Sequence, residues 1–102
     1  MGLNIELQDE LGSRLDGVDD PKELLSGLLP SVGDDAYPML GSIDPYGDTV
    51  FNNLQMRRFL AEWAMLLRNA RAAEEQLLVS TIESLARRCR DEVHVYLKFI
   101  GD

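Results

Sequence analysis

Alternation of apolar and polar side chains at the two ends of the chain constrains the fold more than any other feature. The apolar members of this alternation are Leu3, Ile5 and Leu7 at one end and Val93, Val95, Leu97 and Phe99 at the other. A period of two is typical of strands with one buried face. Because such strands need neighbours and a covering layer, we expect both ends of the chain to meet in one sheet.

The first strand is expected to turn back on itself. Residues 9–12 have the composition of a turn, and Gly12 can adopt a positive φ there. The segment 13–18 then predicts a short second strand that places Leu15 and Val18 beside the first. The interpretation is a β-hairpin at the N-terminal end.

Two amphipathic helices are predicted in the second half of the chain. The apolar positions of the first recur at spacings of three, four and seven: Met56, Phe59, Leu60, Trp63, Leu66, Leu67 and Ala70. A second such stripe runs from about Ala73 to Cys89. Asn69 offers a break between them, and the alternative is one long fused helix.

Between the hairpin and the helices, the sequence predicts a short helix and a long loop. Asp19 or Asp20 is the expected N-cap, Pro21 fits the first turn, and Pro30 ends the helix. Residues 31–48 contain scattered prolines, glycines and large apolar side chains. This is a long segment without a regular pattern, and its apolar content indicates that it lies against the core.

The expected fold class is therefore α+β, with residues 1–102 forming a single domain. It is a two-layer sandwich in which a small antiparallel sheet, made of the N-terminal hairpin plus the C-terminal strand, packs on two long helices. The sheet is expected to have three strands. A chain of 102 residues is near the usual size of one domain.

Negative charge is concentrated in the first half of the chain. Residues 1–50 contain eleven acidic residues against two basic ones, whereas residues 51–102 contain eight basic residues against seven acidic ones. An acidic surface repels phosphate and anionic lipid, so we expect no nucleic-acid partner and no membrane, and a protein partner of basic character is permitted. No secretory signal or membrane span is recognisable, so a cytoplasmic location is expected.

The stretch 44–55, DPYGDTVFNNLQ, has the chemistry of a turn followed by a helix start. Asp44 to Gly47 reads as a β-turn with Pro45 in its second position, and Asp48 or Thr49 is the expected cap of a helix beginning near Val50. A partner-binding turn that presents Tyr46 is a second interpretation. A hard-cation site using Asp44 and Asp48 is a third, although the spacing lacks the pattern of known calcium loops.

Few residues suggest catalysis. His94 is the single histidine, and no serine elbow or glycine-rich phosphate loop accompanies it, so we expect it to be solvated or paired across strands. Cys89 is the single cysteine and falls on the apolar stripe of a helix; it is expected to be buried, with a reactive thiol or an intermolecular disulfide as the alternatives. No disulfide within the chain, no metal and no cofactor are expected.

The leading hypothesis is a non-enzymatic, acidic protein-binding module that docks a basic protein through its acidic N-terminal half and the 31–48 loop. The residues expected to bind are Asp34, Asp35, Tyr37, Asp44, Tyr46 and Asp48. The alternative is a small hydrolase or ligand-binding domain that combines loop carboxylates with His94. A monomer and a homodimer are both compatible with the sequence.

The size, acidity and mixed order of helices and strands are similar to those of small bacterial immunity and antitoxin-like proteins. Those proteins bind and block a partner. The likeness lies in these general properties and involves no sequence motif.

Overall fold

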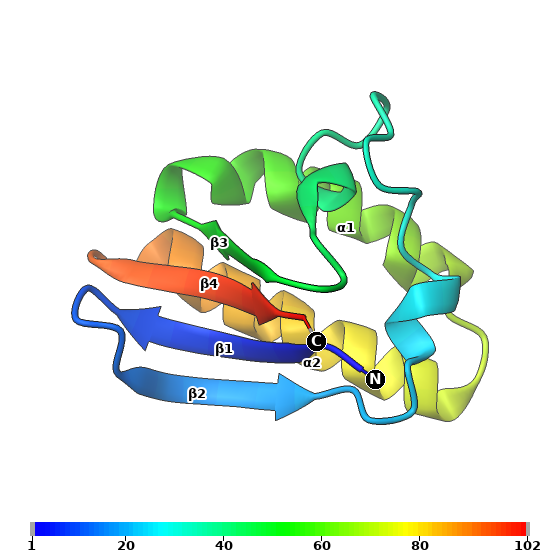
Figure 1. The fold of residues 1–102 in the computed structure, drawn as a ribbon, viewed down its shortest axis with the longest axis horizontal. Helices are drawn as coiled ribbons and strands as arrows, with labels where there is room; N and C mark the ends of the chain where they lie inside the picture. Colours follow the sequence, from blue (N-terminus) through cyan, green and yellow to red (C-terminus); the bar gives the residue numbers. More distant parts are fainter. Residues whose placement is uncertain (1, 102) are drawn as a thin grey trace.

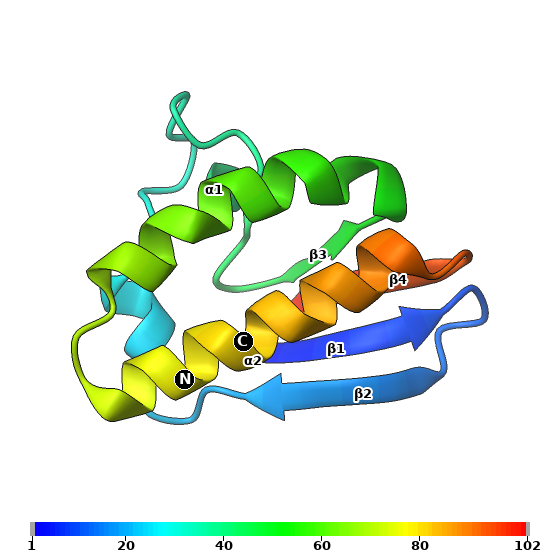
Figure 2. The same cartoon turned by 180° about the vertical axis from the view of Figure 1, so that it is seen from behind.

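The computed structural model describes residues 2–101 and has two layers, a sheet and a pair of helices (Figure 1). The elements are β1 (Asn4–Asp9), β2 (Arg14–Asp19), β3 (Asp48–Phe51), α1 (Met56–Asn69), α2 (Ala73–Asp91) and β4 (Val95–Ile100). The four strands form one antiparallel sheet in the order β2-β1-β4-β3. The helices cover one of its faces, as the view from behind shows (Figure 2). The predicted α+β class and two-layer arrangement are confirmed.

The two ends of the chain form the centre of the sheet. β1 pairs with β4 along its whole length, and Ile5 lies opposite Phe99 while Leu7 lies opposite Leu97. All four of these side chains are fully buried beneath the helices. The alternation seen in the sequence thus gives the correct buried face for both strands.

Aromatic rings join the sheet to the helices. Trp63 on α1 stacks on Phe59 at a centroid distance of 5.3 Å, and Phe99 of β4 lies 6.3 Å from Trp63. The indole Nε1–H of Trp63 donates a hydrogen bond of 3.0 Å to the carbonyl oxygen of Val79 on α2. Trp63 therefore ties together both helices and the sheet. The helices are separate, and none within residues 2–101 is long and apolar enough to cross a bilayer.

The expected start of the first long helix is wrong. Residues 48–51 form the edge strand β3, which adds a fourth strand to the sheet and pairs Phe51 with Leu97. Thr49, Val50 and Phe51 are of the β-branched and aromatic types that suit a strand, and Phe51 buries its ring in the core. The chain then enters a 3₁₀ turn, Asn53–Gln55, which leads directly into α1.

The residue that caps this helical segment is Asn52. Its side-chain oxygen accepts the Gln55 N–H at 3.1 Å, and the Gln55 side chain accepts the Asn52 N–H at 2.8 Å. This reciprocal pair is a capping box. Asp48, which was expected to cap, instead lies 3.4 Å from the ammonium of Lys98.

Replacing Asn52 by alanine should therefore lower the free energy of unfolding by about 1 kcal/mol, the usual cost of losing an N-cap. Asp48→Ala is the matched control, because it removes only an exposed ion pair and should cost roughly 0.5 kcal/mol or less. Urea denaturation of both variants measures the difference. Equal losses, or a larger loss for Asp48→Ala, would contradict this assignment of the cap.

The short helix expected between the Asp19–Asp20 pair and Pro30 is only a 3₁₀ turn, Leu24–Gly27. The N-cap position is occupied by Glu23 rather than by Asp19 or Asp20, although the buried carboxylate of Asp20 accepts the N–H groups of Leu24 at 2.9 Å and Leu25 at 2.8 Å. Glu23 lies in the left-handed region, with φ 56°, so the chain cannot run from Pro21 into a regular helix. The leucines expected to form the apolar face of this helix were Leu24, Leu25, Leu28 and Leu29, and only Leu25 is fully buried.

Two strand ends also differ from expectation. A register shift beside Leu7 puts Asp16 rather than Leu15 opposite that residue, which leaves Leu15 exposed. Val18 lies opposite Ile5, as expected. At the other end, β4 begins only at Val95, and Val93 is exposed because His94 before the strand adopts a φ of 62°.

Cys89 on α2 is fully buried, so its expected role as a small core residue is confirmed. Burial raises the pKa of the thiol to about 11, because the thiolate would lose its hydration. At pH 8 only about one thiol in a thousand would be ionised, even with free access of reagent.

We therefore expect a thiol reagent such as DTNB to label the folded protein at least about a thousandfold more slowly than the guanidinium-unfolded chain, since labelling requires opening of the core. Stopped-flow absorbance measures both rates. Labelling of the folded protein within seconds would instead support a reactive thiol.

Candidate functional site

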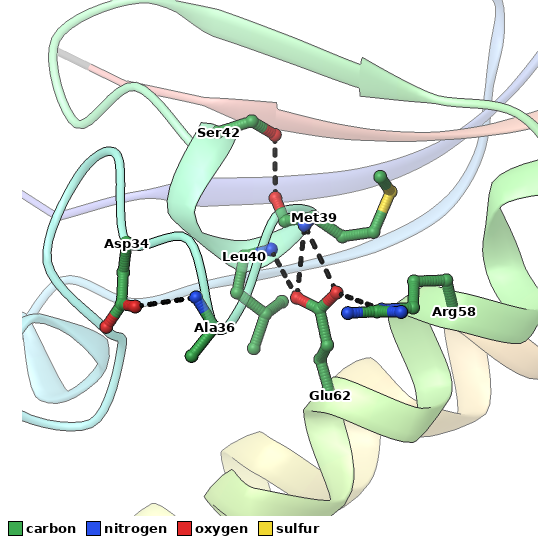
Figure 3. A network of polar contacts seen from close by, with 7 residues as sticks. All are labelled: Asp34, Ala36, Met39, Leu40, Ser42, Arg58 and Glu62. Atoms are coloured by element: carbon green, nitrogen blue, oxygen red, sulfur yellow. Dashed lines mark hydrogen bonds and ion pairs between the residues drawn. The ribbon is translucent and has the colours of Figure 1, made fainter.

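A buried carboxylate on α1 holds the 31–48 loop in place. Glu62 is only 5% exposed and accepts the Leu40 N–H at 2.9 Å and the Met39 N–H at 3.1 Å (Figure 3). The guanidinium of Arg58, one helical turn earlier, lies 2.9 Å from the second carboxylate oxygen. The charge of Glu62 is thus compensated by one cation and two amide donors.

The 31–48 loop packs against the core, and Glu62 holds it there. Leu40 and Ile43 are buried, and Tyr37 and Met39 pack partly against the core. The prediction that this segment lies against the core is confirmed. Tyr37 is accordingly engaged in packing and is only partly available to a partner.

The teal segment near residue 35 forms the outer tip of the loop, away from the 44–47 turn, in both views of the fold (Figures 1 and 2), and Asp34 and Asp35 belong to this segment. The Asp34 carboxylate accepts the Ala36 N–H at 2.9 Å, which is an Asx turn (Figure 3). Asp35 is exposed and makes no ion pair among residues 2–101. Both border a shallow hollow of about 270 Å³. Asp34 is therefore mainly structural, whereas Asp35 presents a free charge.

Asp44 and Tyr46 form the expected turn. The Gly47 N–H donates to the Asp44 carbonyl oxygen at 3.5 Å, and the Asp44 carboxylate accepts the Tyr46 N–H at 2.8 Å. The turn is fastened to the end of β4, because the Gly101 N–H donates to the Gly47 oxygen at 2.7 Å. Tyr46 is 82% exposed on this fixed support.

Two adjoining hollows lie beside Pro45, and one of them also borders Tyr46. One, of about 270 Å³, is bordered by Tyr46 and Pro45, and the other, of about 290 Å³, is bordered by Pro45 and the exposed Val32. Leu3 and Leu29 line both. We call the exposed side chains of Val32, Asp44, Pro45 and Tyr46, together with these two hollows, the Tyr46 face.

Several acidic residues of the first half are engaged in contacts within the chain. Among residues 2–101, Glu6 pairs with Arg14, Asp16 with Arg88 and Asp48 with Lys98, and the Glu10 carboxylate lies beside His94. Others accept backbone N–H groups, as Asp9 does in the β1–β2 turn. The six expected site residues lie on different parts of the fold: Asp34 and Asp35 border the hollow at the loop tip, Tyr37 packs partly against the core, Asp44 and Tyr46 belong to the 44–47 turn, and Asp48 lies in β3.

His94 does not meet the loop carboxylates. Its Nδ1 lies 3.3 Å from a carboxylate oxygen of Glu10 in the β1–β2 turn, and both side chains are exposed. Asp48 pairs with Ile100 at the other end of β4, roughly 17 Å along the strand from the residue after His94. In the part of the chain that the structure describes, His94 forms no ion pair with a carboxylate of the 31–48 loop. Among residues 2–101, no three His, Cys, Asp or Glu side chains are grouped to hold a metal ion.

Sequence reasoning missed Glu62, although its position carried a signal. Glu62 follows Phe59 by three residues and precedes Leu66 by four, so it lies on the apolar stripe of α1. A carboxylate on the buried face of a helix is destabilising unless cations or hydrogen-bond donors compensate its charge. Its partners are backbone amides of a distant segment, which no local pattern reveals.

Comparison of the chain with models of protein families, with curated proteins and with solved structures finds no match.

Proposed function

We propose that this protein is a non-enzymatic protein-binding module whose contact surface is the 31–48 loop, centred on the Tyr46 face, and whose partner is a basic protein. The observation that carries the proposal is an exposed tyrosine on a turn that the rest of the fold holds rigidly. Two hydrogen bonds hold the turn that carries Tyr46. The Gly101 N–H donates to the Gly47 carbonyl oxygen, and the Tyr46 N–H donates to the Asp44 carboxylate in an Asx turn.

Rigid presentation favours binding because little conformational entropy is lost when the partner docks. Tyrosine supplies a large contact area with few rotatable bonds, and it is enriched among residues that dominate binding energy. The adjoining hollows can accept apolar side chains of the partner. Asp44 beside Tyr46, and Asp35 at the loop tip, supply negative charge that attracts lysine or arginine.

The test compares capture of partners from native lysate by the wild-type chain and by Tyr46→Ala. We expect at least one protein to bind the wild type and to lose at least about tenfold in affinity for the variant, as for a central binding residue. Binding of that protein should weaken as salt is raised from 50 to 500 mM. Leu54→Ala is the control, because Leu54 is 85% exposed on the 3₁₀ turn before α1.

Tyr46→Ala should unfold at the same urea concentration as the wild type, since its side chain touches little of the core. If every captured protein binds Tyr46→Ala as tightly as the wild type, the proposed contact surface is wrong. Binding that is insensitive to salt would argue against a basic partner.

A further inference from the structure

The end of β2 lies beside the N-terminal half of α2 (Figure 2), and an apolar groove is formed between these two elements and the Leu24–Gly27 turn; Asp20 separates it from the hollow beside Tyr46. Its volume is about 350 Å³, and its apolar walls come from Val18, Leu24, Leu77, Leu78 and Thr81. The hydroxyl of Thr81 donates to the Leu77 carbonyl oxygen at 2.8 Å, so its methyl group is the part left for contact. The walls are thus supplied by three segments that the tertiary fold brings together.

Leu77 is the most unusual member of this lining. It is 71% exposed on α2, whereas Leu78, the next residue, is buried in the core. A leucine that lines a groove and remains exposed has apolar surface that a partner could cover. Because this wall is open to solvent, the groove suits one side of a polypeptide segment better than a small enclosed molecule.

The charges around the groove define what could bind. Lys22 and Glu74 bridge its two walls, with 3.0 Å between the ammonium and a carboxylate oxygen. Asp19 at the end of β2 is exposed and makes no ion pair within residues 2–101. Asp20 also borders the groove, but its carboxylate is buried on the backbone of Leu24 and Leu25. Among the described residues the accessible rim is therefore net negative, because Asp19 has no cation beside it there.

We propose that this groove is a second docking surface, which takes aliphatic side chains of a partner protein segment flanked by lysine or arginine. The aliphatic groups would cover Leu77, Val18 and Leu24. The flanking cation would pair with Asp19 and share Glu74 with Lys22. The Tyr46 face takes no part in this binding, and the two surfaces are tested separately.

The experiment is a titration of the ¹⁵N-labelled full chain with the peptide acetyl-Lys-Leu-Leu-Lys-amide, followed by amide chemical shifts. We expect saturable shifts at Val18, Leu24, Leu77 and Thr81. Two control peptides, acetyl-Glu-Leu-Leu-Glu-amide and acetyl-Lys-Ser-Ser-Lys-amide, should each bind more weakly, because one has the wrong charge and the other lacks the aliphatic groups.

Variants of exposed residues locate the binding without unfolding the protein. Leu77→Ser should weaken the peptide about tenfold, the loss expected when one leucine contact is removed. Asp19→Asn should weaken it about threefold, in keeping with an exposed ion pair. Leu54→Ser and Asp35→Asn are the matched controls, since these residues lie outside the groove, and both should bind as the wild type does.

The inference is overturned if the basic aliphatic peptide causes no saturable shift in the groove, or if the acidic peptide binds equally well. Groove shifts that grow with protein concentration alone would assign the surface to a second copy of the chain and would also overturn it. Peptide shifts confined to the Tyr46 face would contradict the groove and leave the proposed function standing. If the peptide binds the groove but Tyr46→Ala has no effect on capture, the groove is supported and the proposed function is contradicted.

Discussion

Replacement of Glu62 by alanine is expected to lower the free energy of unfolding by about 3 kcal/mol, because two amide groups of a buried loop lose their acceptor and each costs roughly 1–3 kcal/mol when left unsatisfied. The amides are those of Met39 and Leu40, and the carboxylate that accepts from them is almost fully buried. The loss should appear as a lower midpoint in urea denaturation. Hydrogen exchange at these two amides should accelerate more than at β1.

Two further variants separate the contributions. Glu62→Gln retains a side-chain oxygen and should cost less than alanine. Arg58→Ala removes only an ion pair whose basic partner is largely exposed, so its cost should be about 1 kcal/mol or less. If Arg58→Ala proves as damaging as Glu62→Ala, the cation rather than the loop amides is the main partner of the carboxylate.

The same replacement bears on binding. Glu62 lies in the protein interior and does not border either hollow of the Tyr46 face, yet it anchors the loop that leads into Asp44 and Tyr46. If rigid presentation matters, Glu62→Ala should weaken a partner that depends on Tyr46, under conditions in which the variant remains folded. Unchanged affinity would show that the loop needs no anchoring to bind.

Replacement of Trp63 by alanine is expected to cost about 3–5 kcal/mol, the range for deleting a large buried aromatic side chain. Its ring is fully buried against Phe59 and Phe99, and its N–H satisfies the Val79 carbonyl oxygen. The variant loses apolar burial, ring contacts and a hydrogen bond between the helices. A cost of this size is a large part of the stability of a small domain.

Trp63→Phe tests how the loss is divided. It keeps most of the apolar contact and removes the hydrogen bond, so we expect a loss of about 1–3 kcal/mol. Leu54→Ala serves again as control and should change stability by less than about 0.5 kcal/mol, because its side chain is exposed. A loss for Trp63→Ala close to that of Leu54→Ala would contradict the assigned place of Trp63 in the core.

The sequence by itself determined which segments are strands and helices wherever one face of an element is buried along its length. The buried face of β1 and of the residue before it consists of Leu3, Ile5 and Leu7. The buried face of α1 includes Phe59, Trp63 and Leu66. Burial on one face imposes a repeat of two or of about 3.6 on neighbouring residues, so it can be read locally. The turn at residues 44–47 could also be predicted from the sequence, because proline and glycine determine the backbone dihedral angles available at their own positions.

Only the tertiary structure decided the elements whose state depends on distant partners. Residues 48–51 suit both the start of a helix and an edge strand, and pairing of Phe51 with Leu97 selects the strand. Glu62 is stable inside the protein because Met39 and Leu40 bring it amide donors from more than twenty residues away. The exposure of Tyr46 beside a hollow, and of Leu77 in a groove, likewise depends on segments that meet only after folding. A local sequence pattern reflects the conformation and the burial that each residue favours. A contact between distant segments depends instead on the free energy of the whole fold.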